Sequence, residues 1–253
     1  MIILKTQAEI ALMRESGRIL AKARRLASEQ LRPGITTGEL DDIIHSALLA
    51  EGATPSFLNY QGSGPSPFPK SSCLSVNEEV VHGIPGNRKL KEGDIIGIDI
   101  GVYKDGFHTD SAWTFPIGEV SDEVKLLLRV ARESLEKGIE RARAGARIGD
   151  VSAAIQKHID AYKFGIVREL VGHGIGRSLH EEPSVPNFGR AGTGPKLKEG
   201  MTFCIEPMVN LGTWKVKTKS DGWTMVSADG RPSAHFEHTV AITKSGAEIL
   251  TVE

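Results

Sequence analysis

The sequence predicts an α+β fold made of two similar halves, and three observations carry this prediction. Amphipathic segments that begin with helix-capping signals occur in two pairs, at the start and in the middle of the chain. Runs rich in Ile, Val, Thr and aromatic residues, bounded by glycines, follow each pair. Short motifs also recur in the same order in both parts. We therefore expect one catalytic domain over residues 1–253, with halves of about 1–118 and 119–253.

Four helices are expected from caps that precede apolar residues at helical spacing. Thr6 and Thr36 each stand three residues before a glutamate, which is the capping-box pattern. The first helix should end by Pro33, and the second should begin at Thr36. Ser121 and Asp150 open the third and fourth apolar patterns. Strands are expected at 94–101, 107–115, 201–209 and 235–243.

The internal repeat places acids and histidines at equivalent positions in the two halves. Residues 32–40 resemble 143–151, 81–84 resemble 172–175, 91–99 resemble 198–206, and the strand around Asp110 resembles that around Glu237. The matches pair Asp99 with Glu206, Asp110 with Glu237 and His82 with His173. A pseudo-twofold fold would bring these residues to opposite sides of one central cleft.

Composition excludes several classes of protein. The chain has 253 residues, 40% hydrophobic and 25% charged, and a net charge of -1, so it has no bulk attraction to nucleic acid or membrane. The basic cluster Lys22, Arg24 and Arg25 is expected on a solvated helix face. Cys73 and Cys204 are far apart and are expected as reduced thiols. Without a signal peptide or a run of about 20 apolar residues, a soluble cytoplasmic protein is expected.

Four carboxylates form the strongest functional signal. Asp99 and Glu206 lie inside apolar strands, where an ionised carboxylate is costly unless it is paired or bound to metal. Buried ion pairs would explain any single acid. Four symmetric acids would need four cations, however, and the nearest Lys and Arg lie in flanking turns. We therefore predict a site for two divalent cations, whose charge the four carboxylates balance.

The histidines divide into candidate site residues and structural ones. His173 lies between glycines and repeats His82, which favours a metal ligand. One imidazole among carboxylates favours Mn²⁺, Fe²⁺, Co²⁺ or Zn²⁺ over Mg²⁺ or Ca²⁺. His82 and His180 are interpreted as substrate contacts or proton shuttles.

The remaining histidines are assigned by their places in helices and strands. His45 and His158 lie in amphipathic helices and are interpreted as structural. His108, His235 and His238 lie on the strands of Asp110 and Glu237. They should either point to the other face of the sheet or hydrogen-bond the ligands from behind. No GxSxG, P-loop, HExxH or dinucleotide fingerprint occurs, which disfavours serine hydrolases and nucleotide-binding proteins.

Five longer motifs lie along nearly the whole chain. They are 75–85 (SVNEEVVHGIP), 99–110 (DIGVYKDGFHTD), 171–183 (VGHGIGRSLHEEP), 200–208 (GMTFCIEPM) and 236–239 (FEHT). In this combination they resemble the type I methionine aminopeptidases of the short bacterial form. The resemblance implies the pita-bread fold, a curved antiparallel sheet with helices on its outer face. It also implies removal of the initiator methionine from nascent proteins when the next residue is small.

The resemblance carries over residue roles by position. The implied ligands of two divalent ions are Asp99, Asp110, His173, Glu206 and Glu237, with Asp110 and Glu237 bridging. Glu206 would also be the general base, while His180 and His82 would contact the scissile amide and the substrate backbone. The expected reaction is attack of a metal-bridging hydroxide on the first peptide carbonyl. Cys73, Tyr60, Phe68 and Trp223 fall where the family lines its methionine pocket, and a thiol and aromatic rings suit a thioether.

Three positions depart from the family pattern. The segment 61–68 is longer and richer in Gly and Pro than usual, which affects the alignment of Tyr60 and Phe68. Leu179 replaces a common aromatic pocket residue, and Gly97 replaces a polar one. None of these positions is a proposed ligand.

Two other functions fit the same ligand types. An Xaa-Pro aminopeptidase or dipeptidase usually carries an additional N-terminal domain, whereas here the first helix begins by Thr6. A non-catalytic binding protein of this fold would typically lose ligands, whereas all five positions are filled. A monomer is expected, acting on the N-terminal methionine of nascent polypeptides. The ribosome is a candidate partner for such an enzyme, although no sequence feature indicates contact with it.

Overall fold

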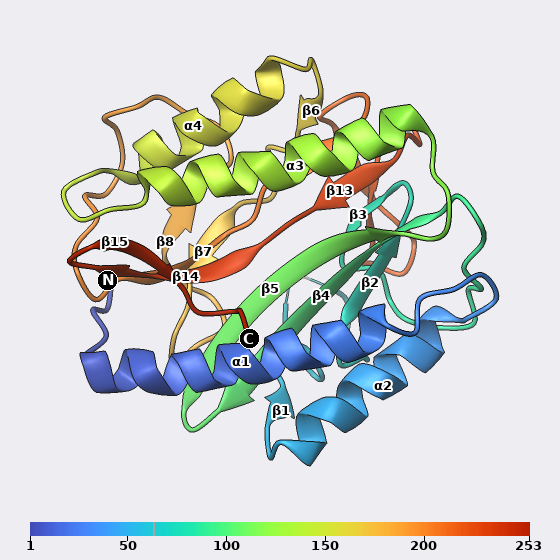
Figure 1. Cartoon of the computed structure of the whole chain (residues 1–253), viewed down its shortest axis with the longest axis horizontal. Helices are drawn as coiled ribbons and strands as arrows, with labels where there is room; N and C mark the ends of the chain where they lie inside the picture. The colour runs from blue at the N-terminus through green and yellow to red at the C-terminus, as the bar shows by residue number, and fades with distance from the viewer. Residues whose placement is uncertain (63) are drawn as a thin grey trace.

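Four helices and a layer of antiparallel strands form the structure, a computed structural model that describes residues 1–62 and 64–253 (Figure 1). The helices are α1 (Gln7–Ser28), α2 (Thr37–Ala50), α3 (Asp122–Arg141) and α4 (Ile148–Asp160). The pair α1 and α2 and the pair α3 and α4 lie at opposite ends of the view, with the strands between them (Figure 1). The α+β prediction with paired helices is therefore confirmed.

The helix starts follow the capping signals, with two differences. Thr6, Thr36 and Ser121 are the N-caps of α1, α2 and α3, as predicted. The end of α1 at Ser28 agrees with the prediction that this helix ends by Pro33, although it comes five residues earlier. The expected opening of α4 at Asp150 is wrong, because the helix begins two residues earlier. Asp150 instead lies within the first turn, where its carboxylate accepts a hydrogen bond from the Arg147 backbone N–H at 2.8 Å.

The strands form several short ladders, and every registered strand pair is antiparallel. In the first half they are β1 (Thr54–Pro55), β2 (Cys73–Val76), β3 (Glu79–Val81), β4 (Ile95–Lys104) and β5 (Phe107–Pro116). Those of the second half are β6 (Gly165–Ile166), β7 (Gly172–Gly174), β8 (Glu181–Val185), β9 (Thr202–Ile205), β10 (Met208–Asn210), β11 (Val216–Thr218), β12 (Met225–Ser227), β13 (Ser233–His235), β14 (His238–Thr243) and β15 (Gly246–Ile249). The sheet orders are β1-β4-β2 with β5 on β4, β13-β10-β6, β11-β12-β3 and β15-β14-β9-β7-β8.

Two of the four predicted strands are interrupted, and both interruptions fall at acids. The runs 94–101 and 107–115 form β4 and β5. The run 201–209 divides into β9 and β10 at Glu206-Pro207, because proline has no N–H for the ladder. The run 235–243 divides into β13 and β14 around Glu237, whose N–H donates to Ala112 O of the other half at 2.8 Å.

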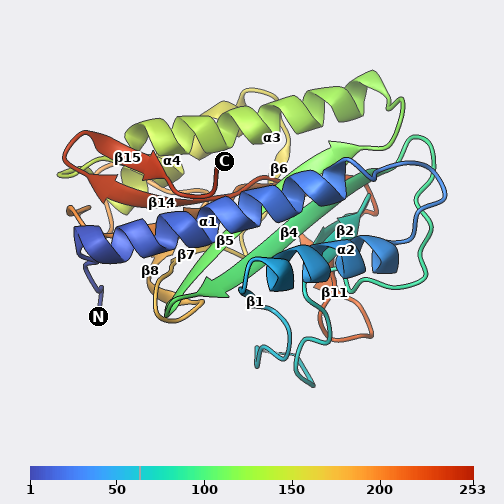
Figure 2. The same cartoon turned by 60° about the horizontal axis from the view of Figure 1, so that its bottom comes forward.

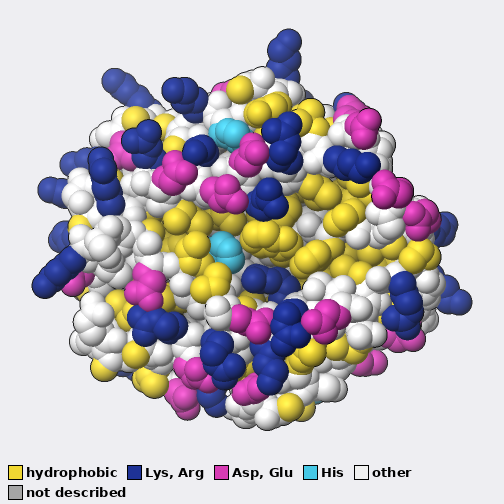
Figure 3. Space-filling view, in the orientation of Figure 1, with side chains coloured by type: hydrophobic (Ala, Val, Ile, Leu, Met, Phe, Trp, Pro, Cys, Tyr) yellow, Lys and Arg dark blue, Asp and Glu magenta, His cyan; other side chains and the backbone are white. Residues whose placement is uncertain are grey.

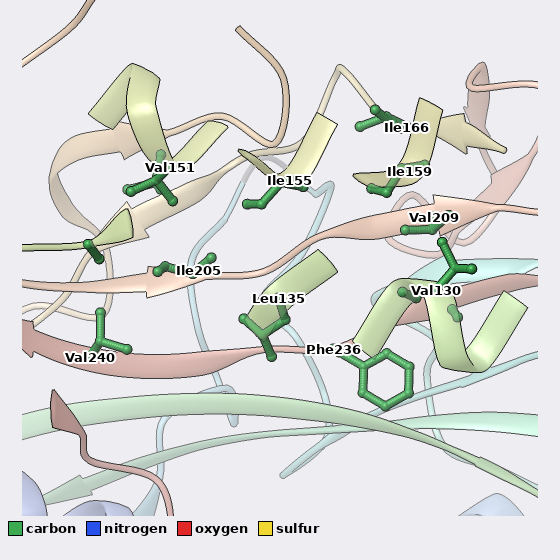
Figure 4. Close-up of a cluster of buried hydrophobic side chains, with 14 of the residues drawn as sticks. Val130, Leu135, Val151, Ile155, Ile159, Ile166, Ile205, Val209, Phe236 and Val240 are labelled. Carbon is green, nitrogen blue, oxygen red and sulfur yellow. The ribbon is translucent and has the colours of Figure 1, made fainter. Parts of the chain in front are cut away.

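Each helix pair covers an apolar face of the strands. In the second half, Val130 and Leu135 of α3 and Ile155 of α4 pack with Val209 of β10 and with Phe236, which lies between β13 and β14 (Figure 4). The first half has its own cluster, in which residues of α1 and α2 pack on β2 and β4. Figure 2 shows α1 and α3 running along the same side of the strands. The division at 118/119 into pseudo-symmetric halves stays a prediction.

The outer face carries basic and acidic side chains around an apolar band (Figure 3). Arg25 is exposed, whereas Lys22 and Arg24 are both half-buried, so the expected solvated face is confirmed only in part. The Arg24 guanidinium lies 5.5 Å from the Trp113 ring centroid and donates to Ser111 Oγ at 2.6 Å. Desolvation by burial lowers its pKa to about 10. Within the described residues, no helix is long and apolar enough to cross a membrane.

Candidate metal centre and substrate cleft

One cavity of about 540 Å³ is lined by every site residue that the sequence singled out. These residues are Asp99, Asp110, His173, Glu206, Glu237, His82, His180, Cys73, Tyr60, Phe68 and Trp223. They come from both halves of the chain. The fold therefore brings the predicted residues together, while their roles stay proposals.

The first pair of acids is positioned by two neighbouring strands. Asp99 of β4 is registered against Ala112 of β5, and Asp110 of β5 against Gly101 of β4. The two acids are thus diagonal neighbours on one face of the ladder, within reach of a shared ion. Asp99 is 9% exposed and Asp110 5%.

The second pair of acids lies at the ends of ladders in the other half. Glu206 directly follows β9, and Glu237 directly precedes β14. The register that pairs His238 with Ile205 places these acids beside each other. His173 of β7 lies 3.6 Å, Nε2 to Oε1, from Glu206.

The glycines beside His173 serve a close backbone approach. A Cβ at Gly172 would collide with the Cys204 carbonyl, and one at Gly174 with the Glu182 carbonyl. His173 Nδ1 lies 2.9 Å from Gly174 O, so the ring donates there and leaves Nε2 as the free acceptor. A neutral imidazole held in this way is suited to bind a metal through Nε2.

Hydrogen bonds between the two halves hold backbone groups at or near the acids. The sequence analysis did not identify the residues that form these bonds. Thr239 Oγ1 donates to Asp110 O at 2.8 Å and accepts from Asp110 N at 2.9 Å. Ser111 Oγ donates to Glu237 O at 2.6 Å, and Thr114 Oγ1 donates to His235 O at 2.8 Å. Each residue lies one or two positions from a predicted acid or on the same strand. Polar side chains in otherwise apolar strands are the signal that could have identified them.

Thr239→Val should lower the free energy of unfolding by about 1–3 kcal/mol, because both backbone groups of Asp110 lose a buried partner. It should also lower kcat, since Asp110 would shift. Thr243→Val is the matched control on the same strand, half-buried and bonded to the Gly246 carbonyl. Urea unfolding and peptidase assays of both variants check this. Equal kcat in the two variants would show that Thr239 only stabilises the fold.

The four acids have the character of an ion site. Asp99 Oδ1, Asp110 Oδ1, Glu206 Oε1 and Glu237 Oε1 are buried with no hydrogen-bond partner among the described residues. Within that part of the chain, their salt-bridge contacts are with histidines, and no Lys or Arg pairs with them. Such buried oxygens are costly unless a cation binds them. The donor set fits divalent ions, as oxygen ligands with imidazole suit first-row metals.

Burial raises the pKa of the acids and lowers the pKa of His173, so it favours the neutral form of both kinds of group. It raises the pKa of Asp99 to about 7. Burial, then the charges of Glu237 and Asp99, raises the pKa of Asp110 well above its ordinary value. Burial and neighbouring acids likewise raise the pKa of Glu206 and of Glu237. Burial lowers the pKa of His173 to about 3, so this ring is already neutral and free to bind a metal.

Metal uptake near pH 6 should therefore release protons from the carboxylates and none from His173. Ions that bind carboxylates must displace the protons that burial retains, for example on Asp99. Release should be smaller at about pH 8.5, where Asp99 is already ionised. Calorimetric titration of chelator-treated protein in buffers of different ionisation enthalpy measures this release. Uptake without proton release near pH 6 would contradict it.

The two candidate catalytic histidines line the same cavity as the acids. The His180 and His173 ring centroids are 4.2 Å apart, and the Tyr60 hydroxyl contacts His180 Nδ1. His82 has a φ of +58°, an uncommon conformation for a non-glycine residue, and its ring meets Trp223 edge-on. Burial lowers the pKa of His82 to about 4 and also lowers the pKa of His180.

An apolar pocket continues from the acids. Phe68 and Trp223 meet edge-to-face with ring centroids 5.3 Å apart, and Cys73 is registered against Asp99. Trp223 Nε1 donates to Ser66 O at 3.0 Å, which attaches the unusual 61–68 loop to the pocket wall. Ser63 of that loop lies outside the described residues. Leu179 also lines the cavity.

The other histidines are placed as follows. His45 bonds Ser71 and His158 lies beside Glu133, both outside the cavity, which agrees with structural roles. His108 bonds Ser56, and His238 bonds Thr251 at 2.8 Å on the side of Trp113. The alternative in which His235 points to the other face of the sheet is wrong, because the His235 side chain lines the cavity. Residues two apart in an extended segment share a face, so its spacing from Glu237 already indicated this.

The sequence model of metallopeptidase family M24 matches residues 11–244 of this chain. The chain belongs to metallopeptidase family M24. Other members of the family are similar over the whole length. The methionine aminopeptidase of Clostridium perfringens is 54% identical over 252 residues, which cover 100% of this chain and 99% of that protein. Methionine aminopeptidase 1 of Bacillus subtilis is 52% identical, covering 99% of each chain.

Solved structures of M24 proteins confirm the pita-bread fold. The crystal structure of methionine aminopeptidase from Rickettsia prowazekii matches with a TM-score of 0.96 and 42% identity, and 100% of each chain is covered. The Xaa-Pro dipeptidase from Bacillus anthracis shares the fold, with a TM-score of 0.79 and 23% identity. That match covers 99% of this chain but 62% of the dipeptidase.

Proposed function

We propose that this protein is a methionine aminopeptidase, which removes the N-terminal methionine of nascent polypeptides when the second residue is small. The observation that carries the proposal is the continuity of one cavity. Four buried acids and a neutral imidazole line it together with Cys73, Phe68 and Trp223. The full-length similarity to methionine aminopeptidases supports the same substrate. Similarity to an Xaa-Pro dipeptidase extends to the fold alone.

The proposed ligands of two divalent ions are Asp99, Asp110, His173, Glu206 and Glu237. Asp110 and Glu237 are proposed to be shared by both ions. Bound divalent ions supply Lewis acidity and an acidified water molecule. The choice among Mn²⁺, Fe²⁺, Co²⁺ and Zn²⁺ depends on affinity order and metal supply.

The chain's own groups bind the peptide, orient it and move its protons. Cys73 and the aromatic rings enclose the thioether side chain and exclude water from it. Glu206 accepts a proton from the attacking water and returns it to the leaving amine. His180 donates from Nε2 toward the oxygen on which charge develops, because the Tyr60 hydroxyl occupies its Nδ1. His82 binds the substrate backbone.

Hydrolysis of Met-Ala-Ser, compared with Leu-Ala and Xaa-Pro peptides, tests the proposed function. We expect turnover of Met-Ala-Ser after reconstitution with Co²⁺, Mn²⁺, Fe²⁺ or Zn²⁺, and loss of turnover with chelator. Preference for an Xaa-Pro peptide would overturn the methionine assignment, and no turnover with any metal would indicate a binding protein. A cytoplasmic location, a monomeric state and contact with the ribosome stay predictions.

A further inference from the structure

His235 is a cavity residue to which neither the sequence motifs nor the proposed mechanism gives a role. It is the last residue of β13, two positions before Glu237, and its side chain is 5% exposed. Its Nε2 atom is buried and has no hydrogen-bond partner within the described residues. A buried imidazole nitrogen without a partner requires a physical explanation.

The His235 Nε2 atom lies near two of the acids but is too far from them for a hydrogen bond. His235 Nε2 lies 3.7 Å from Glu206 Oε2 and 3.8 Å from Glu237 Oε2. Both separations exceed a hydrogen bond, for which about 3.2 Å is the usual upper limit. Donors bound to one metal ion at about 2.1 Å lie up to about 4.2 Å apart. The distance to Glu237, an acid proposed to be shared by both ions, therefore suits common ligation of an ion better than a direct hydrogen bond.

The backbone of His235 is held in place from the other half. Thr114 Oγ1 donates to His235 O at 2.8 Å and accepts from His235 N at 3.0 Å. The ring is buried and lines the cavity. A preorganised nitrogen of this kind is what a metal ligand needs.

Two groups of potential ligand atoms can be distinguished among the described residues, and neither contains Asp110 or Glu206. In one, the ligand atoms of Asp99, His235 and Glu237 all lie within 4.8 Å of one another. In the other, those of His173, Cys204 and Glu237 do so. Glu237 is common to both groups, as expected of a bridging acid, and each group holds one imidazole.

We propose that His235 Nε2 is a ligand of the ion held by Asp99, so that each of the two ions binds one imidazole. This inference rests on the proposed two-metal function and extends its ligand set from five residues to six. Asp99 and the bridging acids alone would give the second ion an all-oxygen site. An added nitrogen shifts that position toward Co²⁺, Fe²⁺ or Zn²⁺ and away from Mg²⁺ and Ca²⁺.

X-ray absorption of the full chain loaded with Co²⁺ counts imidazoles directly. We expect two cobalt ions per wild-type chain and an average of one imidazole per cobalt. His235→Gln should lower the average to one imidazole per two cobalt ions. It should also weaken binding of the second Co²⁺ by at least about tenfold in calorimetric titration. His158→Gln, a change at a histidine outside the cavity, is the control and should match the wild type.

The outcomes separate the inference from the proposed function. Two cobalt ions with one imidazole between them in the wild type would overturn the role of His235 and leave the two-metal site standing. Fewer than two cobalt ions in the wild type would overturn both. The wild-type spectrum decides ligation even if His235→Gln folds poorly, and thermal unfolding of that variant without metal detects such a defect.

Discussion

Glu206→Gln should lower kcat for Met-Ala-Ser by about 10²–10⁴-fold, the usual contribution of a positioned general acid–base group. The amide cannot accept the proton of the attacking water. It is also a weaker metal ligand than a carboxylate, so metal affinity should be measured alongside kcat. Steady-state kinetics at saturating metal removes the effect of weaker metal binding, so the remaining loss of kcat reports the lost proton transfer.

The same substitution should leave the metal-free fold intact. Burial, with the charges of Asp110 and Asp99, raises the pKa of Glu206, so its ionised form is disfavoured there. A neutral amide removes this repulsion, and we expect a Tm of the chelated protein at least equal to that of the wild type. Glu136→Gln, on the exposed side of α3, is the control for both measurements. An unchanged kcat for Glu206→Gln would refute its assignment as the general base.

His180→Ala should lower kcat/KM by about 10²–10³-fold, as expected when one donor to a developing oxyanion is removed. Burial lowers its pKa, which favours the neutral ring, so the proposed donor is the neutral imidazole. The loss should appear mainly in kcat, because the interaction strengthens as charge develops. Stopped assays across several Met-Ala-Ser concentrations separate kcat from KM.

Tyr60→Phe is the matched test of how His180 is oriented. The hydroxyl that contacts His180 Nδ1 disappears, while the aromatic wall remains. We expect a smaller loss, about tenfold, since the ring and its Nε2 are still present. A larger loss in Tyr60→Phe than in His180→Ala would assign the donor role to the tyrosine instead.

Much of the candidate site could be predicted from local patterns, because the proposed acids stand out among apolar strand residues. Asp99 in β4 and Asp110 in β5 stand out for this reason, and both strands lie where expected. Caps such as Thr6 and Thr36 also act within one turn, so their helices began where predicted. The start of α4 was misplaced, since a first-turn acid and a cap carry similar signals.

The sequence by itself determined which residues are candidates, because burial cost and helix capping are set by near neighbours along the chain. Only the tertiary structure decided how they combine. Thr239 meets Asp110, and Arg24 reaches Ser111, across large separations in sequence. The cavity position of His235 depends likewise on contact between β13 and Thr114 of the other half. Such contacts arise when segments that are far apart in the sequence pack against each other, and no local pattern encodes the partner that packing supplies.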